Sequence, residues 1–206
     1  MDDTRQQLMD AAGPLFAERG FRATTVREIC ESAKANQAAI NYHFRDKENL
    51  YVECVRQAGQ SCLARVPMPT WPEGTPPEQK LRDFVRMFLN RVAVDHEPAW
   101  QGQLIMREML LPTKACAEFV KDYVRPTFGV MREILGELLP PQVPERTRLL
   151  LGFSIVGQVL HYRSARPVVE MLVGPETFHS FDVETLTDHI TKFSLAAIAQ
   201  FAQAGA

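Results

Sequence analysis

The sequence is poor in cysteine, which bears on both disulfide and metal chemistry. It contains four cysteines in 206 residues, and no two of them stand in a C-x-x-C pattern. Disulfide frameworks use a denser set of cysteines and zinc ribbons use C-x-x-C pairs, so neither is expected. We expect Cys30, Cys54, Cys62 and Cys116 to be free thiols in a reducing compartment.

Long apolar runs are also lacking. The most apolar stretch, residues 149–160, is interrupted by Gly152, Ser154 and Gly157, whereas a membrane-spanning helix needs about 20 apolar residues. The first five residues are polar and acidic, and no apolar signal core follows them. We therefore expect a cytoplasmic protein with no membrane partner.

An excess of positive charge is missing as well. The chain has 23 basic and 25 acidic residues, a formal net charge of −2, so it does not coat nucleic acid by bulk charge. Residues 1–60 carry eight Lys and Arg against nine Asp and Glu. Any affinity for DNA must then rest on placed contacts rather than on a basic field.

Signatures of catalysis are absent. The sequence has no phosphate-binding loop, no G-x-S-x-G, no H-E-x-x-H and no C-x-x-C pair. Its histidines at 96, 161, 179 and 189 are too scattered to suggest a metal site. We expect no enzyme activity, no metal and no cofactor.

What the sequence does have is helical spacing. Apolar residues recur at intervals of three and four throughout, no convincing alternating strand occurs, and the pattern predicts an all-α fold. Gly20 should end the first helix as a left-handed residue, and Pro14 should kink that helix or cost stability. The further helices are expected at 25–33, 36–44, 46–62, 81–92, 99–111, 116–139 with an interruption at Pro126, 145–164 and 183–204. Proline-rich residues 67–77 form a loop, and residues 165–181 look irregular.

Two short helices near the start have the proportions of a helix-turn-helix. Thr25 and Glu28 read as a capping box, and Asn36 is a good N-cap for the next helix. On that helix Ile40 and Phe44 should face inward, which leaves Gln37, Ala38, Asn41 and Tyr42 outward. Small and polar side chains are the ones that read base edges in the major groove.

The last helix carries two apolar stripes. One contains Leu186, Ile190, Phe193, Ala197 and Phe201, and the other contains Leu195, Ile198, Ala199 and Ala202. A helix that is apolar on two sides must bury both. Either one side meets a partner subunit, or the helix lies deep in its own core.

The exact residues of the N-terminal stretch carry a resemblance. Residues 15–21 (LFAERGF), 23–29 (ATTVREI), 39–44 (AINYHF) and 47–51 (KENLY) resemble the DNA-binding domain of the TetR/AcrR family of bacterial regulators. Arg125-Pro126 and residues 162–167 (YRSARP) look like an AcrR-like subgroup. The resemblance implies a homodimer on a palindromic DNA operator, with the third helix in the major groove.

Carried over position by position, the resemblance assigns DNA contacts. Gln37, Ala38 and Asn41 would lie at base edges, while Tyr42, His43, Lys47 and Thr25 would hold phosphates. Arg27 and Lys34 would be further contacts. Lys34 departs from the family pattern, which has glycine in this turn, so a positive φ there would cost about 1 kcal/mol. Asn41 replaces a common tyrosine, which changes the expected operator.

The resemblance also implies a helical ligand-sensing domain with a mainly apolar cavity. Its walls and polar anchors would come from Trp100, Arg107, Met109, Tyr123, Phe128, His161 and Tyr162. Each of these side chains could instead be an ordinary core or surface residue with no role in ligand binding. Arg107 and Glu108 are the most suggestive pair, because they stand in a helix rich in leucine and methionine.

Together these observations predict two domains. Residues 1–47 would form a three-helix helix-turn-helix domain, and residues 48–206 a helical bundle for ligand sensing and dimerisation. The predicted function is a repressor that a small-molecule inducer releases from DNA, with the fourth helix as the lever. The alternatives are a helical protein-interaction module without DNA binding and, least favoured, a small-molecule enzyme.

Overall fold

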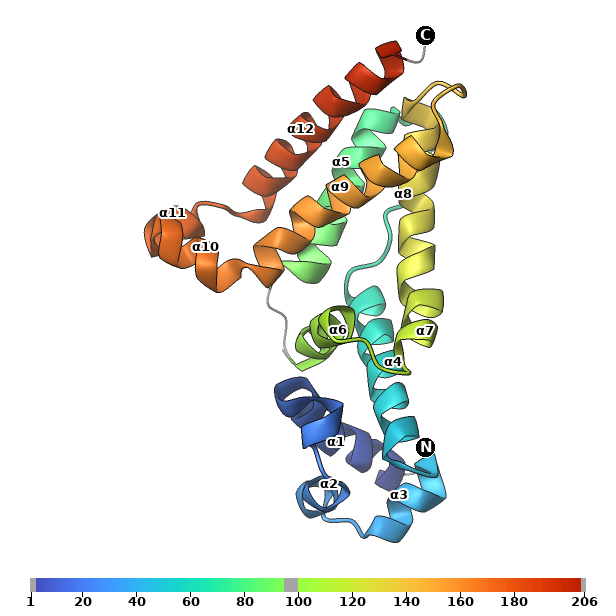
Figure 1. Ribbon diagram of the computed structural model, residues 1–206, viewed down its shortest axis with the longest axis vertical. Coiled ribbons are helices and arrows are strands. Elements are labelled where there is room, and N and C mark those ends of the chain that lie inside the picture. Colours follow the sequence, from blue (N-terminus) through green and yellow to red (C-terminus); the bar gives the residue numbers. More distant parts are fainter. Residues whose placement is uncertain (1–2, 95–99, 205–206) are drawn as a thin grey trace. The chain divides into compact units, whose positions relative to one another are not determined.

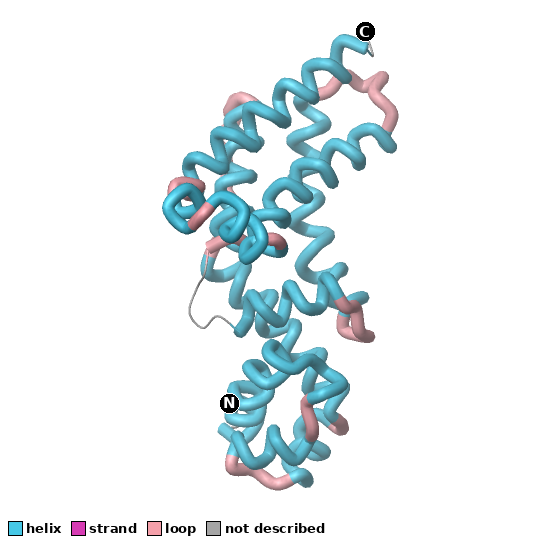
Figure 2. Tube along the Cα trace, turned by 60° about the vertical axis from the view of Figure 1, so that its left-hand side comes forward, coloured by secondary structure: helices cyan, strands magenta, loops and turns pink. Residues whose placement is uncertain are grey.

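The computed structural model describes residues 3–94 and 100–204, and every regular element within them is a helix (Figures 1 and 2). This confirms the all-α prediction. The helices are α1 (Asp3–Ala23), α2 (Val26–Ala33), α3 (Gln37–Phe44), α4 (Lys47–Arg65), α5 (Pro77–Val92), α6 (Trp100–Leu110), α7 (Cys116–Phe119), the π-helix η1 (Val120–Val124), α8 (Arg125–Leu138), α9 (Glu145–Ser164), α10 (Arg166–Val173), α11 (Pro175–His179) and α12 (Val183–Ala204). No helix among the described residues is both long and apolar enough to cross a bilayer.

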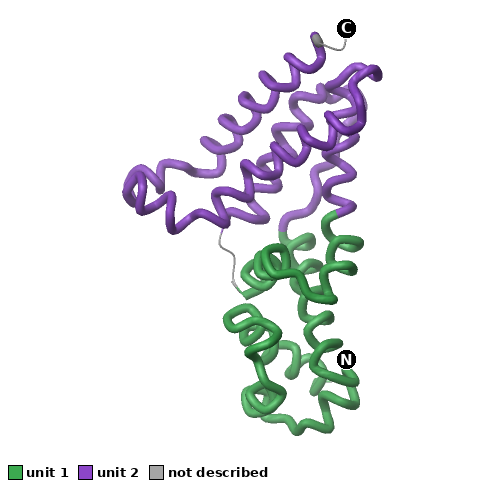
Figure 3. Tube along the Cα trace, in the orientation of Figure 1, with its two compact units in different colours: residues 1–65, 95–124 green, residues 66–94, 125–206 purple. Residues whose placement is uncertain are grey.

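Packing divides the chain into two compact units (Figure 3). Unit 1 contains residues 1–65 and 95–124, and unit 2 contains residues 66–94 and 125–206. Helices α4, α6, α7 and η1 therefore share a unit with the first three helices. The predicted boundary at residue 47 concerns which residues act on DNA, and it stays a prediction.

The first helix of unit 1 breaks where glycine allows it. The backbone leaves helical geometry at Gly20, with φ 82° and ψ 170°. The positive φ was expected, but the ψ value belongs to an extended conformation available to glycine rather than to the left-handed helix. Phe21 folds back to place its ring 6.4 Å from that of Phe16. Pro14 is exposed, and the expected kink is not at Pro14 but at Gly20.

The core of unit 1 holds the short helices in place. Ile29 of α2 and Ile40 and Phe44 of α3 are buried, together with apolar residues of α1, α4 and α6. Helices of eight residues are marginal alone in water, so this burial stabilises α2 and α3. Asp46 accepts a hydrogen bond from the backbone N–H of Asn49 (2.8 Å), which caps the start of α4 as predicted.

Unit 2 is built from α5, α8, α9 and α12, whose apolar faces form a second core. Ion pairs of Arg82 with Asp188 and of Arg86 with Glu184 join α5 to α12. The expected ranges of α9 and α12 are confirmed, whereas α5 ends at Val92 as expected but begins at Pro77 instead of near residue 81.

Two expectations in this half of the chain are wrong. Residues 165–181 are not irregular but contain α10 and α11. Pro167 and Pro175 stand in the first turns of these helices, where the missing N–H has no helical partner to lose. The long helix over 116–139 is not interrupted at Pro126. It changes to π-helical geometry over Val120–Val124, and Pro126 lies in the first turn of α8.

Candidate nucleic-acid interface

The outward face of α3 is the candidate interface. Asn36 caps the helix by accepting a 2.9 Å hydrogen bond from the N–H of Ala39, as predicted. Ile40 and Phe44 are 1% and 3% exposed. The predicted outward residues Gln37, Ala38, Asn41 and Tyr42 are all exposed, and Tyr42 is 83% exposed. The helix is thus fixed from beneath and leaves two amides and a phenol open to a partner.

The turn between α2 and α3 contains Lys34 in the left-handed conformation, with φ 51° and ψ 36°. Its N–H caps α2 by donating to the carbonyls of Cys30 and Glu31. The positive φ considered from the sequence is therefore present, and lysine stands where glycine fits without strain.

The capping box of α2 is complete. The Thr25 hydroxyl accepts from the N–H of Glu28 at 3.2 Å, and the Thr25 N–H donates to Glu28 Oε2 at 2.8 Å. The hydroxyl also lies 2.7 Å from that carboxylate oxygen as a donor. The backbone N–H of Thr25, more than its hydroxyl, lowers the pKa of the Glu28 carboxyl from its ordinary value. A DNA phosphate at Thr25 would compete with the Glu28 carboxylate for the hydrogen bond that this hydroxyl donates.

Lys47 holds the junction between the first two helices. Its Nζ donates to the carbonyls of Phe21 (2.9 Å) and Thr24 (2.8 Å) and lies 4.4 Å from the centre of the Phe21 ring. This amine therefore fixes the start of α4 against the end of α1. Its predicted phosphate contact stays a prediction and would have to share the same amine.

The remaining predicted contact residues differ in exposure and in the partners they already have. Arg27 is exposed and pairs with Glu31 at 2.7 Å, whereas His43 is half-buried with its ring 4.8 Å from that of Tyr42. Arg45, which the sequence analysis did not single out, is an exposed C-cap residue of α3 with φ 74°. The sequence could have drawn attention to Arg45, because it is a basic residue directly after the helix predicted to enter the major groove.

Helix α6 contacts the end of α1 within unit 1. The Arg107 guanidinium donates to the carbonyls of Arg19 (3.0 Å) and Glu18 (3.5 Å) near the end of α1. A Cβ added at Gly20 would lie 2.5 Å from Arg107 Nε, so only glycine lets α6 approach this closely. Arg107 thus contacts α1, and its predicted place in a ligand cavity stays a prediction.

The neighbouring Glu108 is fully buried and joins three segments. Its carboxylate accepts from the Tyr51 hydroxyl (2.7 Å) and from the N–H of Thr113 (2.8 Å). The Tyr51 ring lies edge-on to Phe16 with centroids 4.9 Å apart. Burial raises the pKa of the Tyr51 phenol, and the hydrogen bond to Glu108 raises it further. The sequence marked Glu108 as unusual without indicating these partners.

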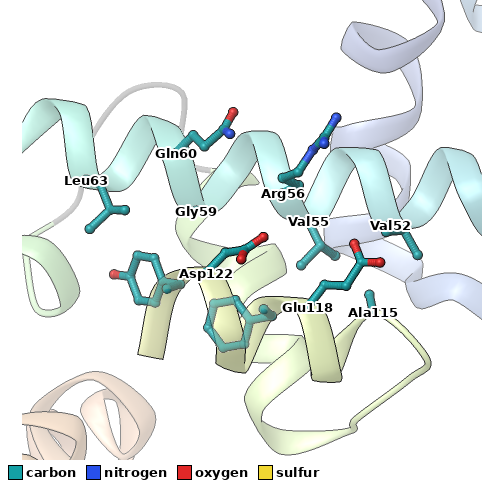
Figure 4. A pocket seen from close by; sticks show the side chains of 11 residues that line it. Val52, Val55, Arg56, Gly59, Gln60, Leu63, Ala115, Glu118 and Asp122 are labelled. Atoms are coloured by element: carbon teal, nitrogen blue, oxygen red, sulfur yellow. The ribbon is translucent and has the colours of Figure 1, made fainter. Parts of the chain in front are cut away.

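A cleft in unit 1 lies between α4 and the segment α7–η1 (Figure 4). Apolar side chains such as Val55 and Phe119 line it, and Arg56, Glu118 and Asp122 stand around it. Of the seven residues predicted to line a ligand cavity, Tyr123 is the one in this cleft.

The other predicted ligand residues are dispersed. Trp100 packs on α1, where a Cβ at Gly13 would lie 2.7 Å from its ring, and Met109 is exposed. Phe128 stacks on Phe153 at 5.1 Å. His161 and Tyr162 border a separate depression with His189. The prediction that these seven side chains share one cavity is not supported within either unit.

Metal-binding groups are not found in the described parts of the chain, where no three His, Cys, Asp or Glu side chains gather as ligands. The four cysteines are free, as expected.

Two family models match the chain. One, the tetR family of bacterial regulatory proteins, matches residues 8–54. The other, the C-terminal domain of the HTH-type transcriptional dual regulator CecR, matches residues 77–198.

Individual proteins give the same result. The dual regulator CecR of Shigella flexneri is 23% identical over 199 residues, covering 92% of this chain and 89% of the relative. The repressor KstR2 of Rhodococcus jostii (strain RHA1) is 46% identical over 52 residues, which are 25% of this chain and 26% of that protein. The crystal structure of AibR, in complex with isovaleryl coenzyme A and operator DNA, shares the fold with a TM-score of 0.60 at 16% identity, covering 93% of this chain and 97% of AibR. The chain therefore belongs to the TetR family of transcriptional regulators and carries a C-terminal domain of the CecR type.

Proposed function

We propose that this protein is a ligand-responsive repressor that binds a palindromic operator as a homodimer and leaves it when a small molecule binds. The observation that carries the proposal is the exposed amide face of α3 above its buried anchors Ile40 and Phe44. Gln37 and Asn41 can each pair bidentately with adenine, a contact worth about 1–3 kcal/mol of discrimination. Ala38 offers a methyl group to thymine.

The positioning contacts go to the DNA backbone. Tyr42 and His43 at the end of α3, Lys47, the Thr25 hydroxyl, Arg27 and Lys34 are proposed to hold phosphates, and these contacts set affinity more than sequence preference. The relative KstR2 carries the name of a repressor, and AibR was crystallised with both a ligand and operator DNA. The name of KstR2 supports the repressor role, and the AibR complex supports a response to a small molecule.

The partner subunit is proposed to cover α9 and α12, which pack on each other in unit 2. Phe153 of α9 and Phe193 of α12 are 58% and 60% exposed, and exposed patches of large apolar side chains mark interaction sites. A two-fold dimer would present two copies of α3 to half-sites about 34–36 Å apart.

Release is proposed to pass through α6 and α4. A ligand shifts a regulator only by binding one of two states better than the other. The cleft between α4 and α7–η1 borders Ala115, two residues after Thr113, whose N–H is bound by Glu108. A ligand that moved this segment would act on the contacts that fix α4 and α1, which makes α4 the lever.

Selection of duplexes from a random pool tests the proposal. We expect a recovered palindrome, relaxed preference at one base position for Gln37→Ala, and uniformly weaker binding for Tyr42→Ala. Met171→Ala, an exposed change on α10 in unit 2, is the matched control and should bind as the native chain does. If the folded protein enriches no duplex at low salt, the alternative of a helical protein-interaction module without DNA binding is favoured.

Three finer assignments belong to the same proposal. The AcrR-like subgroup rests on Arg125-Pro126 and residues 162–167, the reading domain is taken as residues 1–47, and a DNA regulator of this bacterial family would act in the cytoplasm.

A further inference from the structure

We propose that Lys34 and Arg45 form a pair of DNA-phosphate contacts at the two ends of α3, each held in a backbone conformation that glycine would adopt with less strain. The inference rests on the proposed DNA binding and adds Arg45 as a contact, together with a conflict between folding and binding at both positions.

Backbone geometry sets these two residues apart. Among residues 3–94 and 100–204 they are the non-glycine residues with positive φ, at 51° for Lys34 and 74° for Arg45. Lys34 lies in the left-handed helical region, whereas Arg45, with ψ −44°, lies near the rare and strained γ-turn region. A side chain in such a conformation signals strain that is kept for a function at the site.

Their charges are also uncommitted. Most basic side chains nearby already have partners: Arg5 with Glu53, Arg19 with Glu28, Arg27 with Glu31, and Lys47 with two carbonyls. Lys34 and Arg45 are both exposed, and neither side chain makes a hydrogen bond or ion pair with a described residue. The acidic residues that cancel the charge of this region therefore leave these two cations free, as they do Arg22 near the end of α1.

Their spacing suits a groove. Lys34 stands three positions before the first residue of α3, and Arg45 follows its last residue directly. A helix of eight residues is about 12 Å long, and the major groove of B-DNA is about 12 Å wide. With α3 in the groove, a flexible basic side chain at each end can reach the phosphates that border it, while Gln37 and Asn41 between them face the bases.

The conflict predicts opposite changes in two measurements. Lys34→Gly and Arg45→Gly should each raise the melting temperature by about 2–4 °C, because the strain is relieved. Each should also weaken DNA binding about tenfold at 0.1 M salt and reduce the slope of log affinity against log salt by about one. Arg45→Lys keeps charge and strain, so it should retain native affinity and stability.

The test uses the full chain, with the selected operator or, lacking one, a random 30-base-pair duplex, in fluorescence anisotropy at several salt concentrations. Lys121→Gln, which removes one exposed cation from η1 in the same unit, is the control and should leave the salt slope unchanged. If both glycine variants bind with native affinity and slope, or if both melt at lower temperature, the proposal is overturned. If the native chain binds no duplex at all, it is the proposed function that fails.

Discussion

The Tyr51 hydroxyl donates a 2.7 Å hydrogen bond to the Glu108 carboxylate in the interior of unit 1. Tyr51 belongs to α4 and Glu108 to α6, and the same carboxylate also binds the N–H of Thr113 before α7. One buried acid thereby fixes three segments, while Arg107 beside it fixes α1. This arrangement gives a structural route from the cleft to the helices proposed to bind DNA.

Replacing the buried acid should destabilise unit 1. In Glu108→Gln an amide N–H₂ group replaces one of the oxygens that accept from Tyr51 and Thr113, so a buried donor loses its partner. We expect a loss of about 1–3 kcal/mol in the free energy of unfolding, measured by urea denaturation. Glu133→Gln removes an exposed carboxylate of α8 and should change stability little. Equal urea midpoints for the two variants would contradict the role of Glu108.

Two glycines separate backbone strain from crowding. Gly20 and Gly74 both have φ 82°, but an added Cβ meets Arg107 at Gly20 and nothing within 4 Å at Gly74. Gly74→Ala should cost about 1 kcal/mol from strain alone, and Gly20→Ala about 1–3 kcal/mol more from overpacking. Urea denaturation measures both. Arg107→Ala in the Gly20→Ala background should recover part of the loss, and similar values for the two single variants would refute the close approach of α6.

The capping box of α2 should make stability depend on pH. Because the folded-state pKa of Glu28 lies below its ordinary value of 4.5, the ionised carboxylate stabilises the fold above that value. This contribution is lost as pH falls through the folded pKa. Nuclear magnetic resonance titration of the Glu28 carboxyl should show the lowered pKa. Thr25→Ala removes the hydroxyl but keeps the backbone N–H, so it should raise the pKa only part of the way toward 4.5. An unchanged titration in Thr25→Ala would show that the Thr25 hydroxyl does not contribute to the lowered pKa.

The proposed subunit contact should depend on α12 and not on every exposed apolar side chain. Phe193→Ser should weaken the dimer at least tenfold, measured as a dissociation constant by analytical ultracentrifugation, since a large side chain leaves the core of an interface. Met171→Ser is the control, because Met171 is even more exposed, at 78%, but stands on α10. Dissociation by both variants alike, or by neither, would place the interface elsewhere.

Local signals in the sequence predicted the structure well. The caps at Thr25, Asn36 and Asp46 and the buried positions Ile40 and Phe44 depend on spacing within one or two turns. Residues 165–181 were misread because proline and glycine, which interrupt a helix in its middle, here mark where two short helices begin and end.

The ligand site could not be predicted in the same way. Which side chains share a cavity depends on how distant helices pack, and Trp100 and Arg107 are both taken up by contacts with α1. Residue type and spacing gave no indication of this. Glu108 shows the same limit of sequence-based prediction. The sequence singled out this residue but did not identify its partners, which lie 57 and 5 residues away in the chain.

The shortness of α3 has a consequence for any attempt to isolate the reading segment. As a synthetic peptide, α3 would be unfolded, because it has only two turns and is bordered on each side by a residue with a strained backbone. This holds whatever bases its amides can recognise. The proposed recognition would therefore depend on the whole of unit 1. Changes in α6 that never approach DNA would weaken binding by unsettling the helices that hold α3.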